Sequence, residues 1–144
     1  MEKPLPYVTA ALLAETIIED KSGSITVVRI ADRVEYQVQG LPAGYKPVIN
    51  IKGLLSLKSG PVKGEFKLRI IIVRPNGQQQ GDALVLPDFV LHGGDHGQNF
   101  ILNFGIGVQE EGLHWFDVYL DDTLLTRIPL MIVQTQEARE TKQP

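Results

Sequence analysis

The stretch Phe100-Ile101-Leu102-Asn103-Phe104-Gly105-Ile106-Gly107-Val108 carries a large apolar side chain at every even position. Most of the odd positions hold Asn or Gly. Successive side chains of a β-strand point to opposite faces, so a period of two gathers the large side chains on one face. A helix would spread them around its circumference. The stretch therefore predicts a strand with one face in a core.

The same alternation recurs along most of the chain. The apolar rows are Ile49, Ile51, Leu55 and Leu57; Phe66, Leu68, Ile70 and Ile72; Phe116, Val118 and Leu120; and Leu124, Thr126, Ile128, Leu130 and Ile132. Turn signals separate them at Ser59-Gly60-Pro61, Pro75-Asn76-Gly77 and Asp121-Asp122-Thr123. Strands at this spacing without helices between them predict an all-β fold, an antiparallel two-sheet sandwich. Pro129 cannot donate to a ladder, so its strand is expected to be an edge or bulged there.

The segment 8–19 allows two interpretations. Its apolar residues alternate, but Ala10-Ala11-Leu12-Leu13-Ala14-Glu15 also has good helix propensity. We interpret it as a strand that is covered on both faces and pairs with the next strand through the Lys21-Ser22-Gly23 turn. The helix remains the alternative.

A further row shares one phase from residue 28 to residue 38: Val28, Ile30, Val34, Tyr36 and Val38. Asp32 interrupts this row, which we expect to face inward. Since an unpaired buried charge is very costly, we expect Asp32 to pair with Arg33 or Arg127.

Length and composition predict one ordinary globular domain. The chain has 144 residues, of which 43% are hydrophobic and 22% charged. We expect a single β-sandwich domain over residues 1–134 and a polar, disordered tail over 135–144. The sequence has no cysteine, which excludes disulfides, a thiolate nucleophile and cysteine-ligated metal sites.

The charge pattern bears on the partners. The net charge of −3 comes with no run of Lys or Arg, so we expect no nucleic-acid partner. No window approaches the ~20 apolar residues of a membrane helix, and the first residues do not look like a signal peptide. We therefore expect a cytoplasmic protein without a membrane partner.

Two resemblances support the predicted β-sandwich. The residues Glu110-Glu111-Gly112-Leu113-His114-Trp115-Phe116 resemble the start of strand F of an immunoglobulin-like domain, with His114 in the place of its tyrosine and Phe116 in that of its cysteine. The resemblance implies an immunoglobulin-like sandwich of about seven to nine strands, and the missing Tyr and Cys speak against the antibody-type family.

The whole pattern also resembles a group of short bacterial proteins of unknown function. The features that carry this resemblance are Asp20-Lys21-Ser22-Gly23 with Val28-Arg29-Ile30-Ala31-Asp32-Arg33, Gly64-Glu65-Phe66-Lys67-Leu68 with Pro75-Asn76-Gly77, Trp115-Phe116-Asp117-Val118, and Leu125-Thr126-Arg127-Ile128-Pro129-Leu130. It covers most of residues 8–134. It implies no catalytic residue. We expect no cofactor.

Histidines are the candidates for chemistry. His92, Asp95 and His96 lie in a glycine-rich stretch that we expect to be a loop, where they could bind a transition metal. The alternative is a polar turn that joins two strands. His114 is expected to be a core histidine that hydrogen-bonds to a nearby loop carbonyl.

An aromatic stripe is the candidate interaction surface. Leu113, Trp115 and Tyr119 occupy the face opposite Phe116 and Val118, and Ile71, Val73 and Met131 could extend it. We expect this face to be outward or covered by a partner, and the alternative is that a loop or the N-terminal segment covers it.

The leading hypothesis is thus a non-enzymatic interaction or accessory module that binds a protein partner or forms a homo-oligomer. The alternative is a small-ligand or carbohydrate-binding protein that uses the same stripe or the loops at one end of the sandwich. A third is a metal-dependent enzyme that uses His92, Asp95 and His96.

Overall fold

The protein is an all-β sandwich of nine strands over the residues that the computed structural model describes, 4–38 and 40–135. In chain order the strands are β1 (Tyr7–Glu19), β2 (Ile25–Ile30), β3 (Arg33–Tyr36), β4 (Val48–Phe66), β5 (Leu68–Val73), β6 (Gln79–Val85), β7 (Phe89–Gly107), β8 (Gly112–Leu120) and β9 (Thr123–Gln134). Within these residues no helix is long and apolar enough to cross a membrane.

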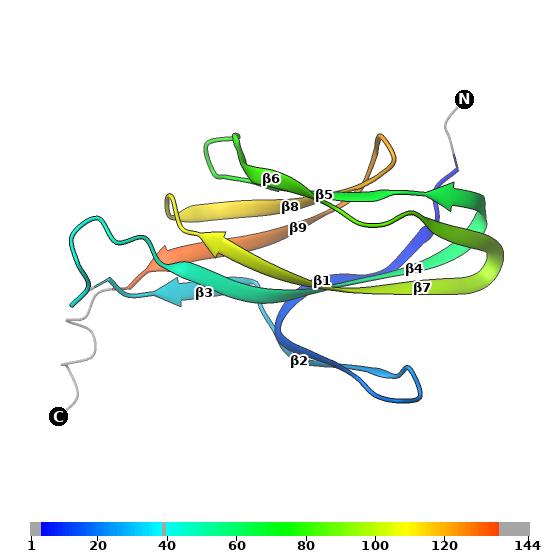
Figure 1. The fold of residues 1–144 in the computed structure, drawn as a ribbon, viewed down its shortest axis with the longest axis horizontal. Coiled ribbons are helices and arrows are strands. Elements are labelled where there is room, and N and C mark those ends of the chain that lie inside the picture. Colours follow the sequence, from blue (N-terminus) through cyan, green and yellow to red (C-terminus); the bar gives the residue numbers. More distant parts are fainter. Residues whose placement is uncertain (1–3, 39, 136–144) are drawn as a thin grey trace.

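The strands form two sheets, which confirms the predicted two-sheet architecture. Sheet A has the order β2-β1-β4-β7 and sheet B the order β3-β9-β8-β5-β6. Figure 1 shows them as two layers, with β1 and β4 in one and β5 and β8 in the other. Neighbouring strands are antiparallel except β3 and β9, which are parallel. The sheets are therefore mostly antiparallel, as predicted, with this one parallel pair.

The core lies between the inner faces of the two sheets. The ring of Phe104 from β7 meets that of Phe116 from β8 edge to face, with centroids 4.9 Å apart and an interplanar angle of 73°. Buried apolar side chains surround this contact, among them Leu13, Leu55, Leu57, Leu102, Ile70, Val118 and Leu130. The rows predicted at 100–108 and 116–120 are thus confirmed as core faces.

The row from Phe66 to Ile72 belongs to both sheets. Strand β4 ends at Phe66 in sheet A, and β5 starts at Leu68 in sheet B. Lys67 bridges them: its N–H donates to Asp121 Oδ1 at 3.1 Å, and its carbonyl accepts the Asp121 N–H at 2.8 Å. The chain therefore passes from sheet A to sheet B while the same alternate residues continue to face the core.

Two expected breaks are bulges inside long strands, so the predictions of a turn at Ser59–Pro61 and of a loop at 91–99 were wrong. Strands β4 and β7 pair along their lengths, and the register shifts near Gly60 and Gly94. Both glycines have positive φ, 56° and 64°. Glycine adopts this conformation without steric cost, so each strand bends and continues.

The segment 8–19 is a strand, as interpreted, but it is not covered on both faces along its whole length. Beyond Ala14, β1 pairs only with β2. Residues 15–30 then project from the sandwich as a two-stranded hairpin, which we call the arm (Figure 1). Val28 and Ile30 lie on the arm and are 39% and 66% exposed, so their predicted inward position was wrong. Val34 and Tyr36 do pack against the core.

Pro129 lies at an edge, the first of the two predicted alternatives. Strand β3 pairs with β9 only from Met131 onward. The Met131 N–H donates to the Asp32 carbonyl on that side, and backbone groups alternate, so the nitrogen of Pro129 also points away from β8. No described strand needs a donor there.

The partners expected for Asp32 were wrong. Arg33 pairs with Glu35, and Arg127 pairs with Asp117. Asp32 is exposed, so its charge needs no buried partner.

The domain reaches at least to Thr135, whose N–H donates to the Tyr36 carbonyl at 2.8 Å. The remaining tail residues, 136–144, lie outside the described residues.

We expect Phe116→Ala to destabilise the fold by about 3–5 kcal/mol, because it removes a fully buried ring from the contact between the sheets. Urea unfolding followed by tryptophan fluorescence measures the change. The control is Tyr45→Ala, whose ring is 49% exposed and which should cost less than about 0.5 kcal/mol. Equal losses for the two variants would contradict the core assignment.

Candidate functional site

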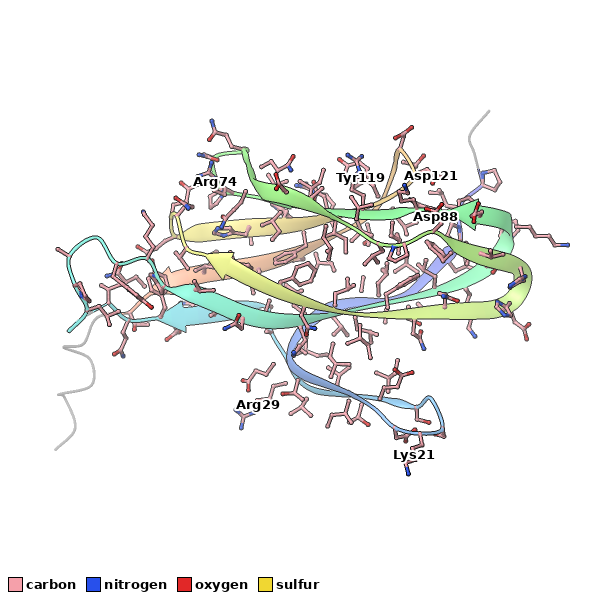
Figure 2. All side chains as sticks on the ribbon, viewed as in Figure 1. Lys21, Arg29, Arg74, Asp88, Tyr119 and Asp121 are labelled. Carbon is pink, nitrogen blue, oxygen red and sulfur yellow. The ribbon has the colours of Figure 1, made fainter. Side chains whose placement is uncertain are left out.

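The outer face of sheet B brings the predicted stripe together. Leu113, Trp115 and Tyr119 lie on β8 and face away from the core that holds Phe116. The register places their neighbours on the same face, namely Met131 and Pro129 from β9 and Val73 and Arg69 from β5. Figure 2 shows Tyr119 on the side of sheet B remote from sheet A. We call this surface the aromatic face.

Two arginines hold the rings of the aromatic face. The guanidinium carbon of Arg127 lies 4.4 Å from the Trp115 ring centroid, and that of Arg69 lies 4.8 Å from the Tyr119 centroid. Arg127 Nε also donates to Asp117 Oδ1 at 2.7 Å. A charge-assisted hydrogen bond and a cation–π contact together limit the rotation of these side chains. The face is therefore a fixed platform with a neutralised charge pair at its centre.

An arginine occupies one face of each of the two rings. A sugar stacks on the open face of an aromatic ring, and one face of both Trp115 and Tyr119 already carries a guanidinium group. The exposed edges of these two rings remain open for an apolar contact. Leu113, which is 36% exposed, adds to this apolar surface.

The candidate metal ligands lie on the bulged part of β7. The rings of His92 and His96 meet edge to face, with centroids 4.5 Å apart. Lys58 Nζ donates to the backbone carbonyl of Asp95 at 3.1 Å. Among the described residues, no group of three His, Cys, Asp or Glu side chains could hold a metal ion. Catalytic zinc sites use three protein ligands and structural sites four.

His114 is a core histidine, as predicted, but its hydrogen-bond partner is a carbonyl of strand β8 and not of a loop. Its side chain is fully buried, and Nδ1 lies 3.0 Å from the carbonyl oxygen of Gly112 at the start of β8. Since a carbonyl only accepts, Nδ1 carries the proton. Nε2 is buried without a hydrogen-bond partner in the described part of the chain.

The arm is an exposed apolar element that the sequence interpretation missed. Ile18, Val28 and Ile30 lie on one of its faces and are 50%, 39% and 66% exposed. This surface lacks the cover that the core gives the other strands. An isolated two-stranded hairpin is only marginally stable in water. The adjacent pairs Ile17-Ile18 and Val27-Val28, apolar on both faces, were the available signal.

The tip of the arm is a turn built around one carboxylate. Asp20 Oδ1 accepts hydrogen bonds from the Ser22 N–H at 2.9 Å, the Ser22 hydroxyl at 2.6 Å and the Ser24 N–H at 3.1 Å. The Ser22 hydroxyl, followed by these backbone groups, lowers the pKa of Asp20 below its ordinary 3.8. Figure 2 shows Lys21 at this tip and Arg29 farther along the arm.

Comparison with known proteins identifies a family and a fold. The model of a family described as "Family of unknown function (DUF6941)" matches residues 9–133. Among curated proteins none matches the chain. The chain is similar to part of an alkylpurine DNA glycosylase from Pseudomonas fluorescens, bound to DNA with an abasic site analogue, at 14% identity and a TM-score of 0.51. That match covers 70% of this chain and 27% of the glycosylase.

Two small structures match over nearly their whole length. An immunoglobulin-like protein from Pseudomonas aeruginosa is 13% identical with a TM-score of 0.42, and the match covers 90% of this chain and 97% of that one. A CARDB domain from Pyrococcus furiosus in complex with di-metal ions is 12% identical with a TM-score of 0.42, over 94% and 100% of the two chains. This chain's own two sheets make it a β-sandwich.

The arm tip should lose its hydrogen bonds in acid. The pKa of Asp20 is lowered in the fold, so its stabilising effect is complete above the ordinary value of 3.8 and is lost as the pH falls through the lower folded value. An NMR titration of the Ser22 and Ser24 amides measures this and should show an inflection below that value. Asp20→Asn removes the titrating group and should abolish the inflection. A midpoint at or above the ordinary value would contradict the assignment.

Zinc should not bind at the two histidines with structural affinity, because they lack a third ligand among the described residues. We expect metal analysis of the purified protein to find no stoichiometric metal. We also expect added zinc to leave the thermal midpoint unchanged in both the wild type and a His92→Ala/His96→Ala variant. A rise in the wild type that the variant loses would show a metal site.

Proposed function

We propose a non-enzymatic, protein-binding role for this chain, which belongs to the DUF6941 family of unknown function. In this role it serves as a cytoplasmic accessory module that docks another protein on the aromatic face. The proposal rests on one observation: arginines hold the rings of Trp115 and Tyr119 in place on the outer face of sheet B, where both residues are partly exposed.

The low cost of fixing side chains on binding supports this role. A surface side chain that becomes fixed on binding costs about 0.5–1.5 kcal/mol of conformational freedom. Trp115 and Tyr119 already have restricted positions in the free chain, so binding orders them at a lower cost. Tryptophan, tyrosine and arginine are also the residues that most often dominate binding energy at protein interfaces.

The central ion pair supports the same role. Asp117 is only 7% exposed, and its carboxylate is bonded to Arg127. A partner that covers this region therefore does not desolvate an unpaired charge, which would be costly. The rim supplies further apolar area at Leu113 and Leu124, both partly exposed.

Site-specific photo-crosslinking in the cells that encode the protein tests this role. A benzophenone amino acid replaces Tyr119 in one variant and the exposed Tyr45 in the control. We expect one adduct of defined mass at position 119 and none at 45. Adding Trp115→Ala should reduce that adduct by about tenfold, the effect of a lost hot spot of about 1.4 kcal/mol.

The adduct mass distinguishes a second copy of the chain from a different protein. No adduct at position 119, or the same adducts at 119 and 45, would contradict the proposed role.

A further inference from the structure

A groove of about 450 Å³ lies between two open sheet edges, away from the aromatic face. One wall is β6, the last strand of sheet B, with Gln80 and Asp82. The other is β7, the last strand of sheet A, with Asn103, Gly105 and Gly107. Apolar side chains line its inner part, among them Ile70, Ile72, Phe104 and Ile106. The groove thus offers backbone groups at its wall and apolar surface beneath.

The backbone of β7 presents free hydrogen-bonding groups to this groove. The N–H of Val108 donates to the Pro47 carbonyl, on the side of β4. Backbone groups of successive residues point to opposite sides, so those of Gly107, Gly105 and Asn103 point away from β4. The Gly107 carbonyl accepts a bond from Gln80 Nε2, which confirms the direction. In the described part of the chain no strand pairs with this side of β7.

This edge lacks the protection that the other edge strands have. Natural edges are shielded by short length, charge, proline or bulges. Strand β3 has four residues, β2 carries Arg29 at a φ of 60°, and β6 carries Asp82 and pairs irregularly with β5. Residues 98–107 of β7 pair regularly with β4 and contain no charged residue and no proline. Along these residues, therefore, neither a charge, a proline nor a bulge hinders pairing with a further strand.

The side chain of Gln80 occupies part of the place that a neighbouring peptide would take. Its amide nitrogen donates to the edge carbonyl of Gly107, as a paired strand would do. Its Oε1 atom is buried and has no hydrogen-bond donor among the described residues. A buried acceptor without a donor is unfavourable, and a peptide N–H in the groove would satisfy it.

We propose that this groove binds an extended peptide segment of a partner protein, which adds a strand to the β7 edge. Five edge residues, 103–107, would pair with about five residues of peptide. Alternate side chains of the peptide would face the apolar inner part of the groove. Asp82 is exposed and has no ion-pair partner in the described residues, so it favours a Lys or Arg on the peptide. The ligand is thus an extended, basic segment with alternating apolar residues.

Binding of a short synthetic peptide tests this proposal. The probe is acetyl-Lys-Val-Lys-Val-Lys-amide, titrated into the labelled full chain and followed by amide NMR. We expect saturable shifts confined to residues 103–107 and to the Gln80 side chain. A peptide with the same sequence and N-methylated backbone should bind at least about tenfold more weakly, because it cannot donate to the edge.

Two variants separate the edge from the charge. Gly105→Pro removes an N–H that β4 does not use, and it should weaken binding about tenfold while the pairing with β4 persists. Asp82→Lys should weaken binding of the lysine peptide and strengthen binding of a peptide with glutamate in place of each lysine. This result tests the proposal even if the proline variant fails to fold. Asp122→Lys, on the turn between β8 and β9, is the matched control and should change neither affinity.

Several outcomes would overturn the proposal. These are no saturable binding at millimolar peptide, equal binding of the N-methylated peptide, and an unchanged preference in Asp82→Lys. Shifts at Trp115 and Tyr119 would instead place the peptide on the aromatic face. A dimer in which 103–107 are protected from exchange without peptide would mean that a second copy fills the edge. Failure of the groove test leaves the crosslinking test of the aromatic face unaffected.

Discussion

The packing of the two inner sheet faces is the constraint on which the rest of the structure depends. Phe104 and Phe116 meet across the centre of the sandwich, and this contact fixes which side of β7 and of β8 faces inward. Because side chains alternate, the outward positions of Trp115 and Tyr119 follow directly. Both proposed binding surfaces are therefore consequences of one core: the aromatic face is the reverse side of sheet B, and the groove lies where the two sheets end.

A sandwich, unlike a closed barrel, leaves sheet edges, and this protein treats its edges differently. Pro129 removes a donor on the side of β9 where no described strand pairs, and Arg29 at a positive φ distorts β2. Such features discourage unwanted strand pairing. Residues 98–107 of β7 have none of them, yet the facing side chain of Gln80 engages their backbone. This contrast within one chain supports the proposal that the β7 edge binds a peptide.

The alternation in the sequence predicted the faces of strands well and their surroundings poorly. It identified the core side of β7 and β8 because a period of two reports the direction of side chains directly. The same period at Val28 and Ile30 suggested burial, but the arm extends past the opposing sheet, and a local pattern contains no information on what lies opposite. Gly60 and Gly94 looked like turn residues, because glycine is equally compatible with a bulge. The parallel pairing of β3 with β9 depends on contacts far apart in the sequence, which no local signal reports.

The most direct test of this account is a solution NMR measurement of proton contacts between selectively labelled phenylalanine rings. The account predicts strong nuclear Overhauser effects between the rings of Phe104 and Phe116, and none between Phe104 and the indole of Trp115. Contacts from Phe104 to Trp115 in place of Phe116 would invert the faces of β8. The core, the aromatic face and the walls of the groove would then all be assigned to the wrong sides.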